Sequence, residues 1–116
     1  MAADFTIKRG SRRPALAVTL SDAAGAINLS AASGVRLVMR RVGESTPALD
    51  VAMTPDPNQT TNPGKVSYAW SDGNTDAAGD YDAEFVITWN DGAEQRVPNR
   101  GAFTIAIVSD LGALTP

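Results

Sequence analysis

The sequence predicts an all-β fold, an antiparallel immunoglobulin-like β-sandwich of seven or eight short strands. Apolar residues alternate with polar ones at the two-residue period of half-buried strands. Clusters of Gly, Pro, Asn and Asp separate these runs at intervals of about 8–12 residues, a spacing that favours an antiparallel sandwich or barrel over strand–helix units. The chain of 116 residues is long enough for one core, so we assign residues 1–116 to a single domain.

The first half of the chain contains three of the predicted strands. In the clearest of them Val35, Leu37 and Met39 face inward while Arg36 and Arg40 face water. The three strands span residues 14–21, 35–42 and 48–53, and residues 27–34 form either one helical turn or an irregular link.

A loop at residues 54–64 divides the two halves. It contains three prolines, two asparagines and no large apolar residue, so it offers nothing to pack into a core. The strand predicted at residues 65–70 follows, with Val66, Tyr68 and Trp70 on one side.

The strongest predicted strand spans residues 80–90. The sequence Asn90-Asp91-Gly92 then predicts a tight hairpin, because Asp-Gly readily supplies positive φ. Return strands are expected at 95–98 and 101–109. The inward face of the strongest strand consists of Tyr81, Ala83, Phe85, Ile87 and Trp89, opposite Asp82, Glu84 and Thr88.

A tyrosine at the start of that strand narrows the fold class. In immunoglobulin-like sandwiches, a Tyr near the start of a late strand donates a hydrogen bond to upstream backbone, which is called the tyrosine corner. Tyr81 fits this position, and Gly79 permits the tight approach. Alternatively, Tyr81 simply opens a half-buried strand after a glycine turn.

Strand and turn motifs extend from about Asp4 to Leu111. They are DFTIKRG (4–10), RPAL (13–16), GKVSYAW (64–70), GDYDAEF (79–85), WNDG (89–92), PN (98–99) and FTI (103–105). Together they resemble the small immunoglobulin-like domains of bacteriophage structural proteins, typified by the N-terminal domain of phage baseplate upper proteins. The resemblance implies an immunoglobulin-like sandwich that forms part of a phage or prophage particle. Two departures are Ser11, where such openings often carry Asp, and the long 54–64 loop.

The composition argues against an enzyme. The chain has no His and no Cys, which removes the commonest general base, the usual transition-metal ligands and any thiol chemistry. We therefore expect no catalytic residue, no metal and no cofactor. The net charge of −3 does not favour nucleic acid as a partner.

The chain also lacks targeting signals. Its start has no run of about 7–15 apolar residues as in a secretory signal, and no stretch approaches the roughly 18 apolar residues of a membrane span. We expect synthesis in the host cytoplasm, no membrane partner and a final location in the virion. A short N-terminal arm is expected at 1–13 and a tail at 111–116.

The charge divides unevenly along the chain. Residues 1–42 carry seven basic and two acidic side chains, a net charge of +5. Residues 43–116 carry three basic and eleven acidic side chains, a net charge of −8. The segments either interleave as ordinary surface charge or form a bipolar surface on which subunits stack.

Two acidic groups suggest weak ligand chemistry. The run 72–76 has the alternating oxygen ligands of a calcium loop, but Ala77 and Ala83 replace the loop's turn Gly and bidentate Glu, so Asx turns explain it as well. Asp80, Asp82 and Glu84 alternate along one strand as a cation patch, a catalytic pair or a solvated strand face.

The predicted protein-docking residues lie in two segments. Four cations beside Phe5 could contact phosphates, but a solvated or protein-docking arm is favoured. Trp70 and Trp89 fall on inward faces, so core packing is expected unless either is exposed. The interaction residues are Phe5, Lys8, Arg9, Arg12 and Arg13 of the arm, with Asp56 and Asn58 of the 54–64 loop.

Three functions of different classes remain. The first is a virion module, in the tail, baseplate or capsid surface, that contacts other virion proteins and copies of itself. The second is a carbohydrate- or receptor-binding module that uses sandwich-end loops. The third is a carboxylate glycosidase built on Asp80, Asp82 and Glu84.

Overall fold

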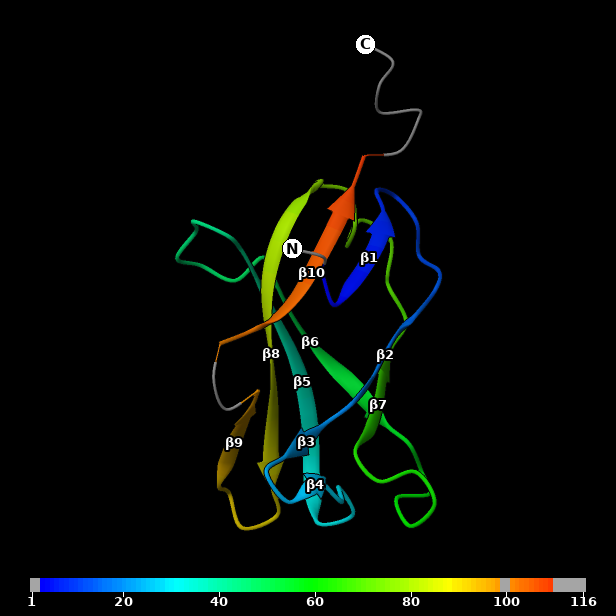
Figure 1. Cartoon of the computed structure of the whole chain (residues 1–116), viewed down its shortest axis with the longest axis vertical. Coiled ribbons are helices and arrows are strands. Elements are labelled where there is room, and N and C mark those ends of the chain that lie inside the picture. The colour runs from blue at the N-terminus through cyan, green and yellow to red at the C-terminus, as the bar shows by residue number, and fades with distance from the viewer. Residues whose placement is uncertain (1–2, 99–100, 110–116) are drawn as a thin grey trace.

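The computed structural model describes residues 3–98 and 101–109, and these residues confirm an all-β, sandwich-like fold (Figure 1). They include no helix able to cross a membrane. Ten strands occur in the described part of the chain. Three of them were not predicted as separate strands: β1 near the N-terminus, and β3 and β4, which form a small hairpin with two residues in each strand. The strands are β1 (Phe5–Lys8), β2 (Leu16–Thr19), β3 (Ser21–Asp22), β4 (Gly25–Ala26), β5 (Ala32–Arg41), β6 (Leu49–Pro55), β7 (Lys65–Tyr68), β8 (Gly79–Trp89), β9 (Glu94–Val97) and β10 (Phe103–Val108).

The antiparallel pairing of β5 with β8 forms the centre of the molecule. The register places Leu37 opposite Phe85 and Met39 opposite Ala83, and all four side chains are buried. These are residues that the two-residue period assigned to the inner faces, so both inner faces are confirmed. Val86, on the opposite side of β8, is also buried, and the register places it between Arg36 of β5 and Arg96 of β9.

On the side away from β5, β8 pairs with two strands. Its first half pairs with β10 and its second half with β9, both antiparallel. The predicted hairpin at the β8–β9 turn is confirmed: the Gly92 N–H donates to Trp89 O at 2.9 Å, and Gly92 has a φ of +90°.

Strand β1 corrects two expectations about the start of the chain. Residues 1–13 were predicted as an arm, but Phe5–Lys8 form a strand that buries Ile7. This strand pairs with β10 in parallel, so the sheet is not purely antiparallel. The parallel pairing is possible because β1 and β10 come from opposite ends of the sequence, with no tight turn to force them antiparallel.

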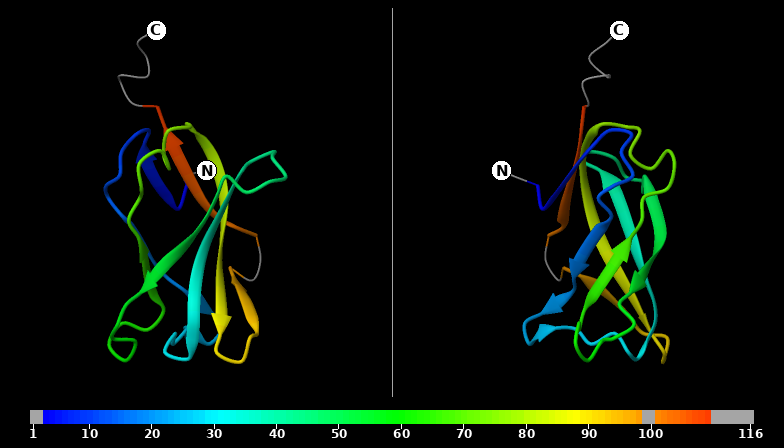
Figure 2. Two further views of the ribbon diagram at one scale, coloured as in Figure 1. Left: turned by 180° about the vertical axis from the view of Figure 1, so that it is seen from behind. Right: turned by 90° about the vertical axis from the view of Figure 1, so that its right-hand side faces the viewer.

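Strand β6 connects the two layers of the sandwich (Figure 2). Its residues Leu49–Met53 pair with β5, and Thr54 and Pro55 then pair with Ser67 and Val66 of β7. The strand therefore ends at Pro55, two residues later than predicted. Strand β7 pairs in turn with β2, so the strand order is β1-β10-β8-β5-β6-β7-β2, with β9 beside β8.

The link at residues 27–34 contains no helical turn. Its side chains Ile27 and Leu29 are buried in the core, and β5 begins at Ala32. Burial of these two apolar residues explains why the segment follows an irregular path instead of a local helix.

Gly64 lies in close backbone contact with Leu20, next to β2 in the second layer. Its φ is +77°, its carbonyl accepts a hydrogen bond from Leu20 N–H at 2.8 Å, and an added Cβ would collide with Leu20 O. We expect Gly64→Ala to lower the free energy of unfolding by about 3 kcal/mol or more, from left-handed strain plus a backbone clash.

Gly10→Ala is the matched control in urea denaturation. Gly10 has nearly the same φ, +80°, but a Cβ added there would have nothing within 4 Å. It should lose only the strain, about 1–2 kcal/mol. Equal losses for both variants would contradict the predicted clash.

Candidate interaction surfaces

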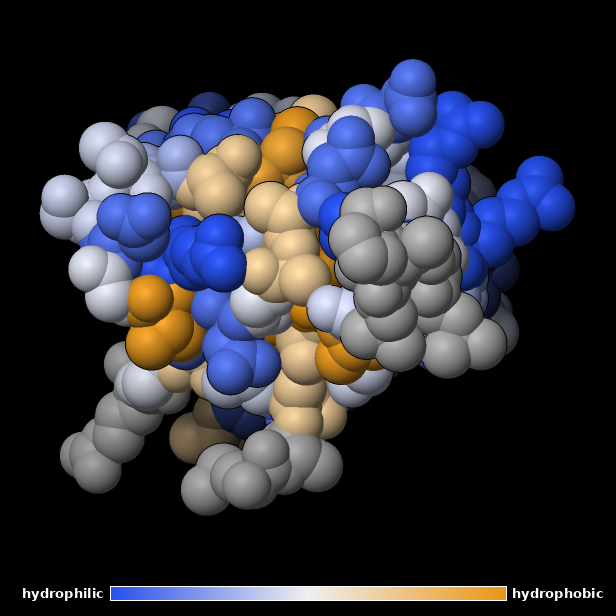
Figure 3. Space-filling model, turned by 90° about the horizontal axis from the view of Figure 1, so that it is seen from above, coloured by the Kyte–Doolittle hydropathy of each residue, from blue (hydrophilic) through white to orange (hydrophobic). Residues whose placement is uncertain are grey.

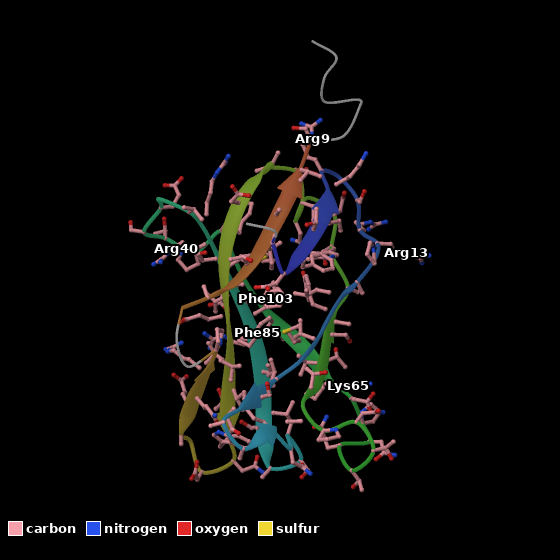
Figure 4. All side chains as sticks on the ribbon, in the orientation of Figure 1. Arg9, Arg13, Arg40, Lys65, Phe85 and Phe103 are labelled. Atoms are coloured by element: carbon pink, nitrogen blue, oxygen red, sulfur yellow. The ribbon has the colours of Figure 1, made fainter. Side chains whose placement is uncertain are left out.

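The predicted N-terminal docking residues do not form one surface. Phe5 is half-buried and its ring packs on Trp70 with centroids 6.0 Å apart, so the ring is engaged within the domain, and its role as an interaction residue stays a prediction. Arg12 and Arg13 are exposed in the connection to β2. Figure 4 shows Arg9 beside the end of β10 and Arg13 along the side of the molecule, so the cations spread around this end.

The predicted loop residues lie at the opposite end of the molecule (Figures 1 and 2). Asp56 Oδ1 accepts a hydrogen bond from Asn58 N–H at 2.8 Å, and Asn58 Oδ1 accepts one from Thr61 N–H at 3.0 Å. Both side chains thus cap turns of their own loop. The structure does not bring them together with the basic residues near β1.

A buried glutamine, which the sequence interpretation missed, holds the 54–64 loop in place. Gln59 is 7% exposed, and its Oε1 accepts hydrogen bonds from Leu29 N–H at 3.0 Å and Gly64 N–H at 2.9 Å. Its Nε2 donates to Asp56 O at 2.8 Å. The expectation that the loop has nothing to pack is therefore wrong, because an amide side chain links the loop to the core.

The corner before β8 has the hydrogen bond that a tyrosine corner makes. The Tyr81 hydroxyl donates to Ala77 O, four residues upstream, at 2.7 Å. Arg41 Nη2 donates to the next carbonyl, Ala78 O, also at 2.7 Å. Gly79 allows this approach, because a Cβ there would lie 2.9 Å from Arg41 Nη2.

The acidic face of β8 lines a shallow hollow on the outside of the sheet. Asp82 and Glu84 are half-buried there, in a space of about 600 Å³ that Arg40 and Thr104 also line. The register places Arg40 directly opposite Asp82. Among the described residues, no group of three acidic or other metal-ligating side chains is placed to hold a metal ion, so Asp80, Asp82 and Glu84 do not make a cation patch.

The run 72–76 is organised by its own hydrogen bonds. Asn74 Oδ1 accepts from the Tyr68 hydroxyl at 2.6 Å and from Ser71 N–H at 2.7 Å. Both bonds engage the oxygen that a calcium ion would need, so the run fits a turn organised by its own Asn side chain better than a calcium site.

Both tryptophan side chains make contacts within the domain. Trp70 is 4% exposed and packs against Phe5 and Tyr68. Trp89 is half-buried, and its Nε1 donates to Gln95 Oε1 at 3.3 Å. The core packing expected for Trp70 is confirmed, and neither ring forms an exposed platform.

The two oppositely charged segments interleave. Strand β5, from the basic segment, lies between β6 and β8 of the acidic segment. Arg36 pairs with Asp50 at 3.0 Å, and Arg40 stands opposite Asp82. Figure 3, which views the end that carries β1, shows hydrophilic side chains over much of the surface with apolar ones between them. A bipolar stacking surface is therefore not supported.

The comparisons with known proteins inform the fold. No protein-family model matches the chain, and no curated protein is similar to it. Among solved structures, the chain resembles CopC from Methylosinus trichosporium OB3b with a TM-score of 0.50 and 9% identity, over 93% of this chain and 86% of that one. This likeness shows the fold alone, and the resemblance to phage structural domains stays a prediction.

Replacing Gln59 tests the link between the loop and the core. Gln59→Leu leaves two backbone N–H groups without their acceptor, so we expect a loss of about 2–4 kcal/mol in the free energy of unfolding. The neighbouring exposed Thr60 supplies the control, because Thr60→Leu should change stability by less than about 0.5 kcal/mol. Chemical denaturation followed by tryptophan fluorescence measures both, and similar values would contradict the proposed link.

Replacing Tyr81 tests the corner. Tyr81→Phe keeps the ring and removes only the hydroxyl that donates to Ala77 O. We expect a loss of about 1 kcal/mol, the usual net value of one such hydrogen bond, with the native circular dichroism spectrum retained. An unchanged denaturation midpoint would show that the corner bond does not stabilise the fold.

Proposed function

We propose that this chain is a non-catalytic structural module of a bacteriophage or prophage particle, which acts through protein–protein contacts with other virion proteins and copies of itself. The structural observation that supports the proposal is the open sheet. Strands β1 and β2 stand at the two ends of the strand order, and each has a pairing partner on one side. Unpaired strand edges are surfaces on which other protein chains dock.

The exposed cations near β1 add a second kind of contact. Arg12 and Arg13 are exposed in the connection from β1 to β2. Charged groups at the rim of an interface mainly set the register and rate of docking, which suits an ordered assembly. The glycan- or receptor-binding alternative draws no support from run 72–76 or from either tryptophan, because all three are engaged within the domain.

Particle incorporation tests the proposal. We expect the chain to copurify with particles from an induced culture of its source strain, in a fixed ratio to other particle proteins measured by quantitative mass spectrometry. Its absence from every particle, together with a strictly monomeric native mass, would contradict the proposal.

Charge reversal tests the contribution of the basic residues. The double variant Arg12→Glu/Arg13→Glu should reduce incorporation severalfold, because rim charges govern association. Lys65→Glu is the control: Lys65 is also exposed but lies on β7, away from this end (Figure 4). Equal losses for both variants would show that overall charge, not this surface, matters.

A further inference from the structure

We propose that the seam between β2 and the β9–β10 side of the sandwich binds an extended segment of a partner protein, which adds a strand to β2. This inference rests on the proposed function and names the docking site within it. The partner segment carries a large apolar side chain, with a lysine or arginine close to it in sequence. Three independent features of the seam lead to this proposal.

The first feature is the unpaired edge of β2. Leu20 N–H bonds to Gly64 O, so Leu20 directs its backbone groups toward the β7 side. Because these groups alternate in direction along a strand, Leu16 and Val18 face β7 as well, while Ala17 and Thr19 face away from it. In the described structure β2 pairs with β7 alone, so the N–H and C=O groups of Ala17 and Thr19 are available to an added strand.

The second feature is a hollow beside this edge. It has a volume of about 320 Å³ and reaches from β2 to the β9 and β10 strands. Its lining includes Val18, Leu20, Val97, Phe85 and Phe103. Figure 4 shows Phe85 and Phe103 near the middle of the molecule, and their rings meet edge to face with centroids 5.3 Å apart. The hollow therefore leads to the aromatic part of the core.

The geometry of strand addition connects the edge with the hollow. Side chains of an added strand would alternate between the inner and outer faces of the sheet, as in β2 itself. An inward side chain would enter the hollow beside Val18, while main-chain groups bond to Ala17 and Thr19. Strand addition uses this division, in which main-chain bonds give affinity and pockets for alternate side chains give specificity.

The third feature is the charge at the rim. Among the described residues, those that line the hollow include Asp4, which carries a carboxylate, and no cation. Asp4 Oδ2 accepts hydrogen bonds from Thr104 N–H at 2.9 Å and from Thr104 Oγ1 at 3.1 Å, which fixes the carboxylate in position. Its Oδ1 has no partner among the described residues, so the rim favours a cationic side chain on the partner.

A blocked synthetic peptide tests the proposal on the whole chain. The probe is acetyl-KTLTFTK-amide, which alternates large apolar and polar residues and ends in lysines. Backbone hydrogen exchange, followed residue by residue by NMR, should slow about tenfold or more at Ala17 and Thr19 when the peptide is added, because these amides become hydrogen-bonded. Ring resonances of Phe85 and Phe103 should shift in the same titration.

Two protein variants separate the edge from the rest of the surface. Ala17→Pro removes the N–H that faces the seam and leaves the β7 ladder intact, since proline is tolerated on edge strands. It should abolish peptide binding, whereas Ala17→Val, which keeps the N–H, should bind as the original chain does.

Two altered peptides provide matched controls. One has alanine in place of leucine and phenylalanine, and the other has glutamate in place of lysine. Each should bind at least fivefold more weakly than the original peptide.

The outcomes distinguish this inference from the proposed function. Exchange that does not slow at Ala17 and Thr19, binding that persists in Ala17→Pro, or perturbation confined to the other edge strand, β1, would each overturn the seam as a docking site. Particle incorporation of Ala17→Pro at the original level would overturn the seam in the particle, yet it would leave the structural role intact. Absence of the original chain from particles would overturn the structural role, whatever the peptide does.

Discussion

The pairing of β5 with β8 is the constraint on which the rest of the structure depends. Within the eight-stranded sheet, the neighbouring strands are attached to one of these two: β6 to β5, and both β9 and β10 to β8. Strand β1 is reached through β10, and β7 and β2 through β6. A one-residue slip between β5 and β8 would turn Leu37 and Phe85 to opposite faces, so this register sets the position of the whole core.

The sheet stays open because of the path that β6 takes away from this central pair. After Met53 the strand stops following β5 and continues beside β7, which carries the chain into the second layer. The second layer is short, because β7 and β2 have four residues each. On the opposite side, β9 and β10 divide the edge of β8 between them. The seam lies where these two incomplete sides face each other, so it follows from the topology itself.

Residues whose burial follows the two-residue period of a strand could be predicted from the sequence. Residues whose burial depends on a contact with a distant part of the chain could not. The inward faces of β5 and β8 follow from alternation, and the β8–β9 turn follows from Asp91-Gly92. Gln59 is buried because two backbone N–H groups, Leu29 and Gly64, converge on its oxygen, and no local pattern encodes that convergence. The strand β1 was missed for a similar reason: its four residues are ordered by a partner, β10, that lies about a hundred residues later.

Several residues that the sequence suggested as contact residues are instead packed or hydrogen-bonded within the domain. The sequence suggested docking residues in two segments, the N-terminal arm and the 54–64 loop. In the structure Phe5 supports Trp70, and the loop's polar side chains cap their own turns. What remains exposed is distributed around two ends and carries no large apolar patch, since Val42 and Val108 are the large apolar residues exposed among those described. A surface of this kind binds poorly through apolar contact alone. Backbone hydrogen-bonding groups at strand edges do not depend on side-chain composition, so they are the contacts by which such a domain can bind other chains.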